Sequence, residues 1–140
     1  MFKRVDHIEL IPSNLDRTIK FYTEVLGFKL QSRRKMGAPP PSQSRSQPLP
    51  PSPIQEIAFI ELNGMLIEMF SVKNPAPVSK EPWQVGYRRI ALEVEDMDKL
   101  AKHLKSKGIE ITVRQMPGGK TKFSELRDPD GLSIELMQRG

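Results

Sequence analysis

The spacing of hydrophobic positions predicts that the chain opens with a strand followed by a helix. Residues 5–11 alternate with a period of two, so His7 and Leu10 lie on opposite faces of the strand. A helical stripe follows, for which Ser13 is the expected N-cap and Gly27 the residue that ends the helix. The apolar residues of that stripe are Leu15, Ile19, Tyr22 and Leu26.

Further strands are predicted in the first half of the chain at residues 28–32, 54–62 and 65–72. Asn63 and Gly64 join the last two of these strands, and this dipeptide is a strong signal for a tight hairpin. In the strand after the turn, Glu68 shares a face with Phe70 and lies among apolar neighbours. A charge among apolar side chains is costly unless it is paired or bound to a metal, so Glu68 is a candidate functional residue.

The second half of the chain repeats the element order of the first half. Asp96 is the expected N-cap of its helix and Gly108 the residue that ends it. Strands are expected at residues 87–94, 109–113, 121–127 and 132–138. The opening strands of the two halves correspond at an offset of 82 residues, and the closing strands, with Glu68 and Glu135, at an offset of 67. The first copy is therefore longer by 15 residues, and the pattern indicates an internal duplication of a strand–helix–three-strand unit.

A tract rich in proline and serine supplies about that extra length. We expect residues 37–53 to form a loop without packed structure, either a lid over a pocket or a ligand for a PxxP-binding domain. This loop belongs to a first module at residues 1–72, which a linker at residues 73–85 joins to a second module at residues 86–140. The two modules are expected to form a single domain.

Composition limits the class of protein and its location. The 140 residues are 37% hydrophobic, which fits one domain or two half-domains that share a core. The absence of cysteine excludes disulfides, thiolate chemistry and Cys-based zinc sites. No apolar run approaches the ~20 residues of a membrane span, and the N-terminus does not resemble a signal peptide. We therefore expect a cytoplasmic protein without a membrane partner.

The net charge of +5 raises the question of nucleic-acid binding. Surfaces that bind nucleic acid concentrate Lys and Arg on one face, often with interleaved aromatic residues. Here the basic residues are scattered and the densest runs are short. The charge pattern therefore predicts no nucleic-acid partner and favours attraction for an anionic small molecule.

Several short motifs accompany the duplicated unit: His7-Ile8-Glu9-Leu10, Phe21-Tyr22, Leu26-Gly27-Phe28, and Asp128-Pro129-Asp130-Gly131 before Ile134-Glu135-Leu136. Taken together, the duplicated unit and these motifs resemble the vicinal oxygen chelate superfamily. That family includes glyoxalase I, methylmalonyl-CoA epimerase, extradiol dioxygenases, and the bleomycin- and fosfomycin-resistance proteins. The resemblance implies an α+β fold in which two tandem βαβββ modules form a cup-shaped, eight-stranded mixed sheet with the helices outside.

The resemblance also implies a metal in the cup, held by four positions that fall here on His7, Glu68, Arg89 and Glu135. One imidazole and two carboxylates suit Mn, Fe, Co, Ni or Zn. Arg89 stands where metal-binding members usually have a His or Glu, and a guanidinium cannot ligate a metal. Three interpretations stay open: a salt bridge to Glu68 or Glu135 in a metal-free cup, a clamp on an anionic substrate beside a three-ligand metal, or an outward-pointing side chain.

Two functions follow from the resemblance as hypotheses. With a metal at His7, Glu68 and Glu135, the protein would be a lyase or isomerase that forms an enediolate from a substrate with adjacent oxygens, with Glu68 or Glu135 moving the proton. Arg89, Phe70 and Leu92 would contact that substrate. Without a metal, the cup would be a small-molecule binding module for resistance or sequestration, lined by apolar residues that include Ile60, Leu66, Phe70 and Leu92. By analogy with the family, a homodimer is expected.

Overall fold

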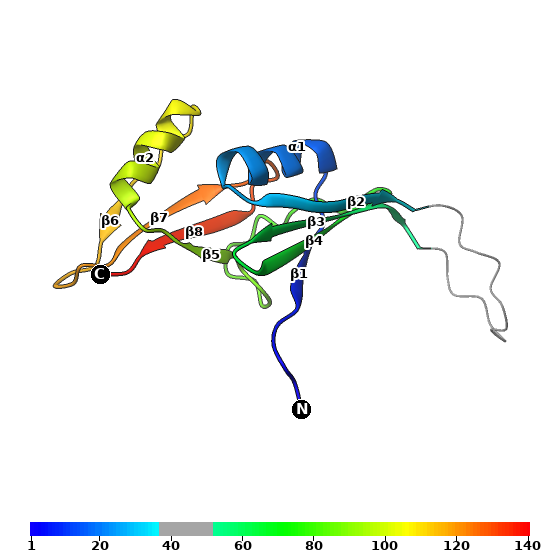
Figure 1. Cartoon of the computed structure of the whole chain (residues 1–140), viewed down its shortest axis with the longest axis horizontal. Coiled ribbons are helices and arrows are strands. Elements are labelled where there is room, and N and C mark those ends of the chain that lie inside the picture. Colours follow the sequence, from blue (N-terminus) through cyan, green and yellow to red (C-terminus); the bar gives the residue numbers. More distant parts are fainter. Residues whose placement is uncertain (37–51) are drawn as a thin grey trace, which may run out of the picture. The chain divides into compact units, whose positions relative to one another are not determined.

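The computed structural model describes residues 1–36 and 52–140, and the predictions for the Pro/Ser tract fall mostly outside these ranges. The chain divides into two compact units, Met1–Pro77 and Val78–Gly140, each with its own mixed four-stranded sheet and helical segment (Figure 1). Each unit has the predicted order of strand, helix and three strands, so the α+β fold class is confirmed. In the described part of the chain, no helix has both the length and the apolar character needed to cross a membrane.

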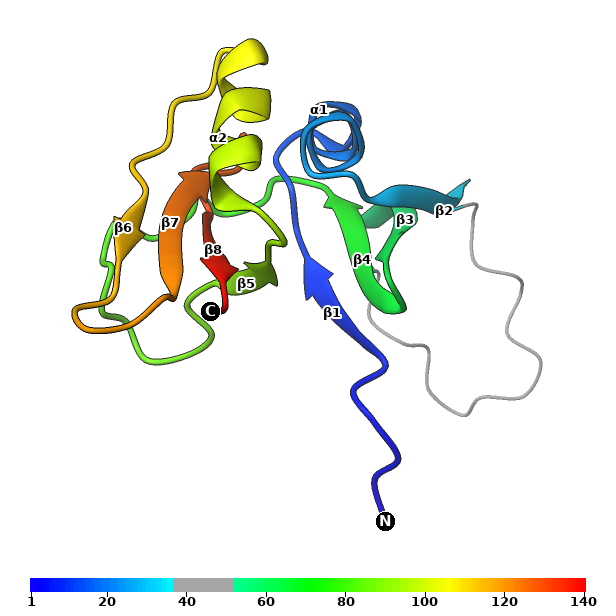
Figure 2. The same cartoon turned by 60° about the vertical axis from the view of Figure 1, so that its left-hand side comes forward.

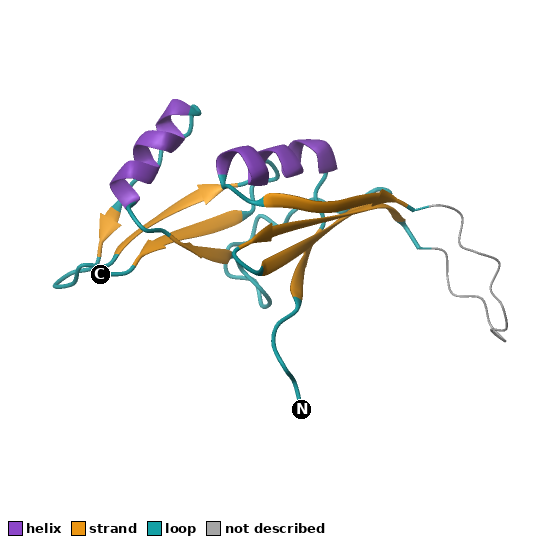
Figure 3. Ribbon diagram, viewed as in Figure 1, coloured by secondary structure: helices purple, strands orange, loops and turns teal. Residues whose placement is uncertain are grey.

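Unit 1 contains a sheet with the strand order β1-β4-β3-β2. Strand β1 runs parallel to β4, whereas the β4–β3 and β3–β2 pairs are antiparallel. Its elements are β1 (His7–Leu10), α1 (Leu15–Lys20), the π-helical turn η1 (Phe21–Val25), β2 (Lys29–Lys35), β3 (Ile54–Leu62) and β4 (Met65–Val72). Figures 2 and 3 show α1 lying over one face of this sheet.

The helix of unit 1 begins one residue later than predicted. The N-cap is Asn14 and not Ser13, because the Asn14 side chain accepts a 3.0 Å hydrogen bond from the backbone N–H of Arg17. The helix then widens into the π-helical turn, where the Thr23 hydroxyl donates to the carbonyl of Ile19. Gly27 has a φ of +84°, a left-handed conformation that ends the helix as predicted.

The hairpin between β3 and β4 fixes which side chains share a face. Asn63 and Gly64 have φ values of 47° and 88°, as the predicted two-residue turn requires. The resulting register pairs Ile60 with Ile67 on a face that is fully buried. Strands alternate, so the next residues on β3 and β4 point to the opposite face of the sheet.

Unit 2 contains a sheet with the strand order β5-β8-β7-β6, in which β5 runs parallel to β8. Its helix starts at the predicted cap, Asp96, whose carboxylate accepts hydrogen bonds from the amides of Asp98 and Lys99. Leu104 on this helix and Leu136 on β8 belong to the buried core. The elements are β5 (Ile90–Glu93), α2 (Met97–Ser106), β6 (Arg114–Gln115), β7 (Lys122–Arg127) and β8 (Ser133–Gln138).

The strand predicted at residues 109–113 is wrong. The exposure of side chains alternates along residues 109–113 as in a strand. The backbone ladder with β7, however, is formed by the next two residues, Arg114 and Gln115. The segment is instead tied to β7 by the Ser124 hydroxyl, which donates a 2.9 Å hydrogen bond to the carbonyl of Thr112. A side chain therefore replaces the backbone pairing that the alternation suggested.

Candidate metal centre and ion-pair network

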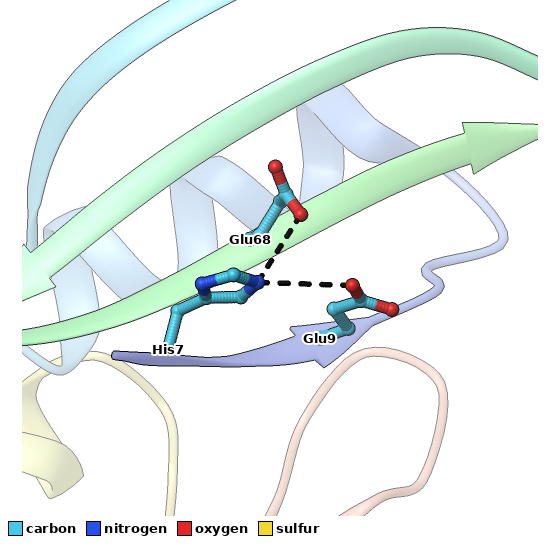
Figure 4. Close-up of side chains that lie close together, drawn as sticks. All are labelled: His7, Glu9 and Glu68. Carbon is cyan, nitrogen blue, oxygen red and sulfur yellow. Dashed lines mark ion pairs between the residues drawn. The ribbon is translucent and has the colours of Figure 1, made fainter. Parts of the chain in front are cut away.

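Three side chains that can ligate a metal converge on one face of unit 1. His7 and Glu9 stand two residues apart on β1, so both point to the same side of the strand. Glu9 lies directly opposite Glu68 of β4 in the parallel register, which places Glu68 on that side too. Figure 4 shows the imidazole of His7 directed at both carboxylates.

The three groups lie within reach of a single ion. The Nε2 atom of His7 is 3.4 Å from Oε1 of Glu68 and 3.7 Å from Oε1 of Glu9. One ligand atom from each residue lies within 4.8 Å of the others. The side chain of Glu68 is 13% exposed and that of Glu9 is 59% exposed, so the cluster extends from the sheet towards solvent.

Two neighbours fix the orientation of the His7 ring. Its Nδ1 donates a 2.9 Å hydrogen bond to Oδ2 of Asp6, and Phe59 of β3 meets it edge-on at a centroid distance of 5.9 Å. The hydrogen bond to Asp6 is the main reason that the pKa of His7 is raised, with the negative charge of Glu68 adding to it. The same bond lowers the pKa of the Asp6 carboxyl. Because the bond to Asp6 occupies Nδ1, Nε2 is the nitrogen that faces the two glutamates.

The donor set fits a divalent transition metal. Imidazole nitrogen and carboxylate oxygen are ligands for Mn, Fe, Co, Ni and Zn. In such sites a carboxylate typically accepts a hydrogen bond from the His nitrogen that does not bind the metal. His7 and Glu68 are two of the predicted ligands, and the structure brings these two together. Glu9 was missed, although the period of two along residues 5–11 already placed it beside His7.

The other two predicted site residues meet in unit 2. Nη2 of Arg89 lies 3.0 Å from Oε2 of Glu135, and Nη1 lies 3.4 Å from Oε2 of Glu125. Arg127 in turn lies 2.7 Å from Oε1 of Glu125. Two arginines and two glutamates thus form a network with no net charge, which we call the Arg89 network. The interpretation in which Arg89 points outward is wrong, whereas a salt bridge to Glu135 is present.

A cavity of about 330 Å³ lies beside the Arg89 network in unit 2. Arg89, Glu125 and Glu135 form part of its wall. Phe123 and Ile111 add apolar surface, so charged and apolar groups line the same space.

Two residues predicted to line a ligand site lie on the core face of their sheets. Leu92 pairs with the buried Leu136, and not with Glu135, in the β5–β8 register. Ile60 is fully buried opposite Ile67. Both predictions are therefore wrong, because one residue along a strand changes the face to which a side chain points.

Phe59 of β3 also shares a face with the metal-ligating side chains. It lies directly opposite Glu68 in the antiparallel register and contacts the ring of His7. The two-residue turn at Asn63-Gly64 sets this register and is a signal that could have identified Phe59 from the sequence. Leu66 and Phe70, also predicted to line the site, follow the parity of Glu68 on β4 and are half-buried.

Comparison with known proteins identifies the family. The model of the Glyoxalase/Bleomycin resistance protein/Dioxygenase superfamily matches residues 4–136, and the chain belongs to this superfamily.

Individual relatives agree with this assignment. The chain is 31% identical to the uncharacterized protein YaeR of Escherichia coli, over 98% of this chain and 97% of the relative. It is also 31% identical to the lactoylglutathione lyase GLX1 of Arabidopsis thaliana, over 99% of this chain but only 45% of the plant protein. The crystal structure of a glyoxalase family protein from Enterococcus faecalis superposes with a TM-score of 0.73 at 26% identity, covering 97% of this chain and 98% of the other.

Proposed function

We propose that this chain is a divalent-metal-dependent lyase or isomerase of the glyoxalase type, acting on a small molecule with two adjacent oxygen atoms. The convergence of His7 and Glu68, 3.4 Å apart on one sheet face, carries this proposal. These are positions at which the family resemblance implies metal ligands. The similarity to a plant lactoylglutathione lyase supports the same class of reaction.

Each side chain of the site would have its own role in the reaction. His7 is a fixed neutral donor through Nε2, because its Nδ1 proton is held by Asp6. His7 and Glu68 would hold a divalent cation, which would supply Lewis-acid polarisation of the two adjacent substrate oxygens. Glu68 or Glu135 would take a proton from the substrate carbon and return it. Phe70 and Arg89 remain proposed substrate contacts.

Proton exchange at the substrate carbon tests this reaction. A panel of 2-hydroxyacyl thioesters that includes lactoylglutathione would be incubated in D₂O with metal-loaded protein, and loss of the α-proton signal followed by NMR. We expect exchange with the unaltered chain and none with His7→Ala or after chelation. Glu24→Gln serves as a control variant, because Glu24 is exposed on the helical turn η1 and is not one of the metal-ligating candidates. Exchange that persists in His7→Ala would contradict the proposal.

The Arg89 network favours a second candidate function, a metal-free module that binds a small molecule for resistance or sequestration. Arg89 places a fixed positive charge 3.0 Å from Glu135, a carboxylate that the resemblance assigns to the metal. A binding module predicts that members of the thioester panel, or other small anions, raise the melting temperature in the presence of a chelator and undergo no α-proton exchange. We further propose a cytoplasmic homodimer by analogy with the family, to be checked by light scattering coupled to size exclusion.

A further inference from the structure

We infer that Glu9 is the third protein ligand of the metal, so that His7, Glu9 and Glu68 of unit 1 form the complete protein part of the site. This inference rests on the proposed function, because it concerns the same metal. It changes the ligand set that the resemblance implied, since it replaces Glu135 of the second module by a residue of the first. The site would then be built within one sheet.

The backbone of unit 1 places all three donors without any rearrangement of the sheet. His7 and Glu9 share a face of β1, and Glu9 is the direct partner of Glu68 in the parallel pair β1–β4. Parallel pairing holds such partners about 5 Å apart at the backbone, a separation that two glutamate side chains span easily. One ligand atom from each of the three residues thus reaches the same place because of the register in which β1 and β4 pair.

The separations between Nε2 of His7 and the two carboxylates are close to those of ligands around one ion. Ligand atoms that each stand about 2.0–2.2 Å from a metal lie roughly 3.0–3.5 Å apart in octahedral or tetrahedral geometry. The distances from Nε2 of His7 to the carboxylates of Glu68 and Glu9 are 3.4 Å and 3.7 Å. Both exceed the roughly 2.9 Å of a typical hydrogen bond. The second distance needs a shift of only a few tenths of an ångström, and Glu9 is exposed enough to make it.

An independent observation outside the cluster also indicates a ligand role for His7. Asp6 holds Nδ1 of His7 at 2.9 Å, and Phe59 packs against the ring from the side. Metal-bound histidines typically donate their second N–H to a carboxylate, which fixes the tautomer and directs the free nitrogen at the ion. Here that free nitrogen is directed at Glu9 and Glu68 (Figure 4).

The contacts of unit 2 explain why a replacement ligand is needed. Arg89 occupies a usual ligand position and cannot bind a cation. It lies 3.0 Å from Glu135, so a metal would compete with a guanidinium for that carboxylate. Glu9 has no arginine or lysine partner among the ion pairs of the described residues.

Titration with Co²⁺ tests the inference, because cobalt reports its ligand field in visible absorption without any need for turnover. Tag-free protein would be titrated as the unaltered chain, Glu9→Gln, Glu9→Asp and the charge-matched control Glu24→Gln. We expect Glu9→Gln and Glu9→Asp each to raise the Kd for Co²⁺ by at least about 10-fold and to alter the spectrum. Glu9→Asp keeps the charge but withdraws the carboxylate, so it separates ligation from attraction at a distance. Glu24→Gln should behave like the unaltered chain.

Other results of the Co²⁺ titration would overturn the inference, the proposed function or both. Unchanged affinity and spectrum in Glu9→Asp and Glu9→Gln would overturn the inference while leaving the proposed metal-dependent function intact. The same holds if Glu135→Gln, and not Glu9→Gln, weakens Co²⁺ binding. No binding of Co²⁺, Ni²⁺, Zn²⁺ or Mn²⁺ by the unaltered chain would overturn the metal-dependent function, and the inference with it. Circular dichroism on each variant confirms that the comparison is between folded proteins.

Discussion

Replacing Arg89 with alanine tests the Arg89 network of unit 2. Arg89 lies 3.0 Å from Glu135 and 3.4 Å from Glu125, and these two glutamates face each other directly across the β7–β8 pair. Like charges directly opposite on neighbouring strands repel. Arg89→Ala therefore removes the positive charge that offsets the repulsion between the two carboxylates, and the free energy of unfolding should fall.

The exposure of the three side chains sets the magnitude. Arg89 is 25% exposed, Glu135 20% and Glu125 37%, so the network is neither buried nor fully solvated. Two like charges about 5 Å apart repel by about 3 kcal/mol at an effective dielectric constant of 20 and about 0.8 kcal/mol in bulk water. Exposed ion pairs contribute about 0–1 kcal/mol and broken buried pairs about 3–5 kcal/mol. We expect Arg89→Ala to cost about 1–2 kcal/mol.

Urea denaturation followed by circular dichroism measures this cost. Arg88→Ala is the matched control, because Arg88 is the neighbouring arginine and its guanidinium lies over the Trp83 ring at 4.5 Å, outside the Arg89 network. Its loss should cost roughly 0.5 kcal/mol. The double variant Arg89→Ala with Glu135→Gln should recover at least half of the loss, since it removes the repulsion as well.

The reasoning would be refuted if Arg89→Ala were no less stable than Arg88→Ala. It would also be refuted if Glu135→Gln destabilised the Arg89→Ala chain further. Either result would mean that water, and not Arg89, screens the two carboxylates.

Two further predictions concern the helix cap and the core. The backbone N–H of Lys99 lowers the pKa of Asp96 below its usual 3.8, so the ionised cap stabilises α2; the melting temperature of the unaltered chain should exceed that of Asp96→Asn above about pH 4, and the gap should vanish as the pH falls well below 3.8. A gap that persists at about pH 2 would contradict this assignment. Ile60→Ala should lower the free energy of unfolding by about 2–5 kcal/mol in urea denaturation, because Ile60 is fully buried; a loss under about 1 kcal/mol would place it outside the core.

Local signals in the sequence predicted most of the fold. The Asn63-Gly64 turn and the Asp96 cap depend on backbone conformation and hydrogen bonds within a few residues, and both are present as predicted. The prediction of a strand at residues 109–113 was wrong because an alternating pattern indicates only which side chains face the core. It does not report whether the backbone finds a partner strand, and here the Ser124 hydroxyl takes that place.

Part of the candidate site could be predicted from the alternation of side chains along each strand. The family resemblance implied His7 and Glu68 as ligands, whereas Glu9 and Phe59 were missed, although strand parity and the hairpin register place both on the same face. Leu92 and Ile60 were assigned to the site as apolar residues without a check of parity. The second partner of Arg89, Glu125, was not predicted, because it follows from the β7–β8 register, which brings Glu125 opposite Glu135.

The metal content of tag-free protein tests the central claim most directly. The protein would be incubated with Mn²⁺, Fe²⁺, Co²⁺, Ni²⁺ and Zn²⁺, freed of unbound metal and subjected to elemental analysis, in parallel with His7→Ala. We predict close to one equivalent of a divalent metal in the unaltered chain and almost none in His7→Ala, because Nε2 of His7 is the nitrogen that faces both carboxylates. No metal in the unaltered chain, or equal metal in His7→Ala, would contradict a metal centre on this face of unit 1.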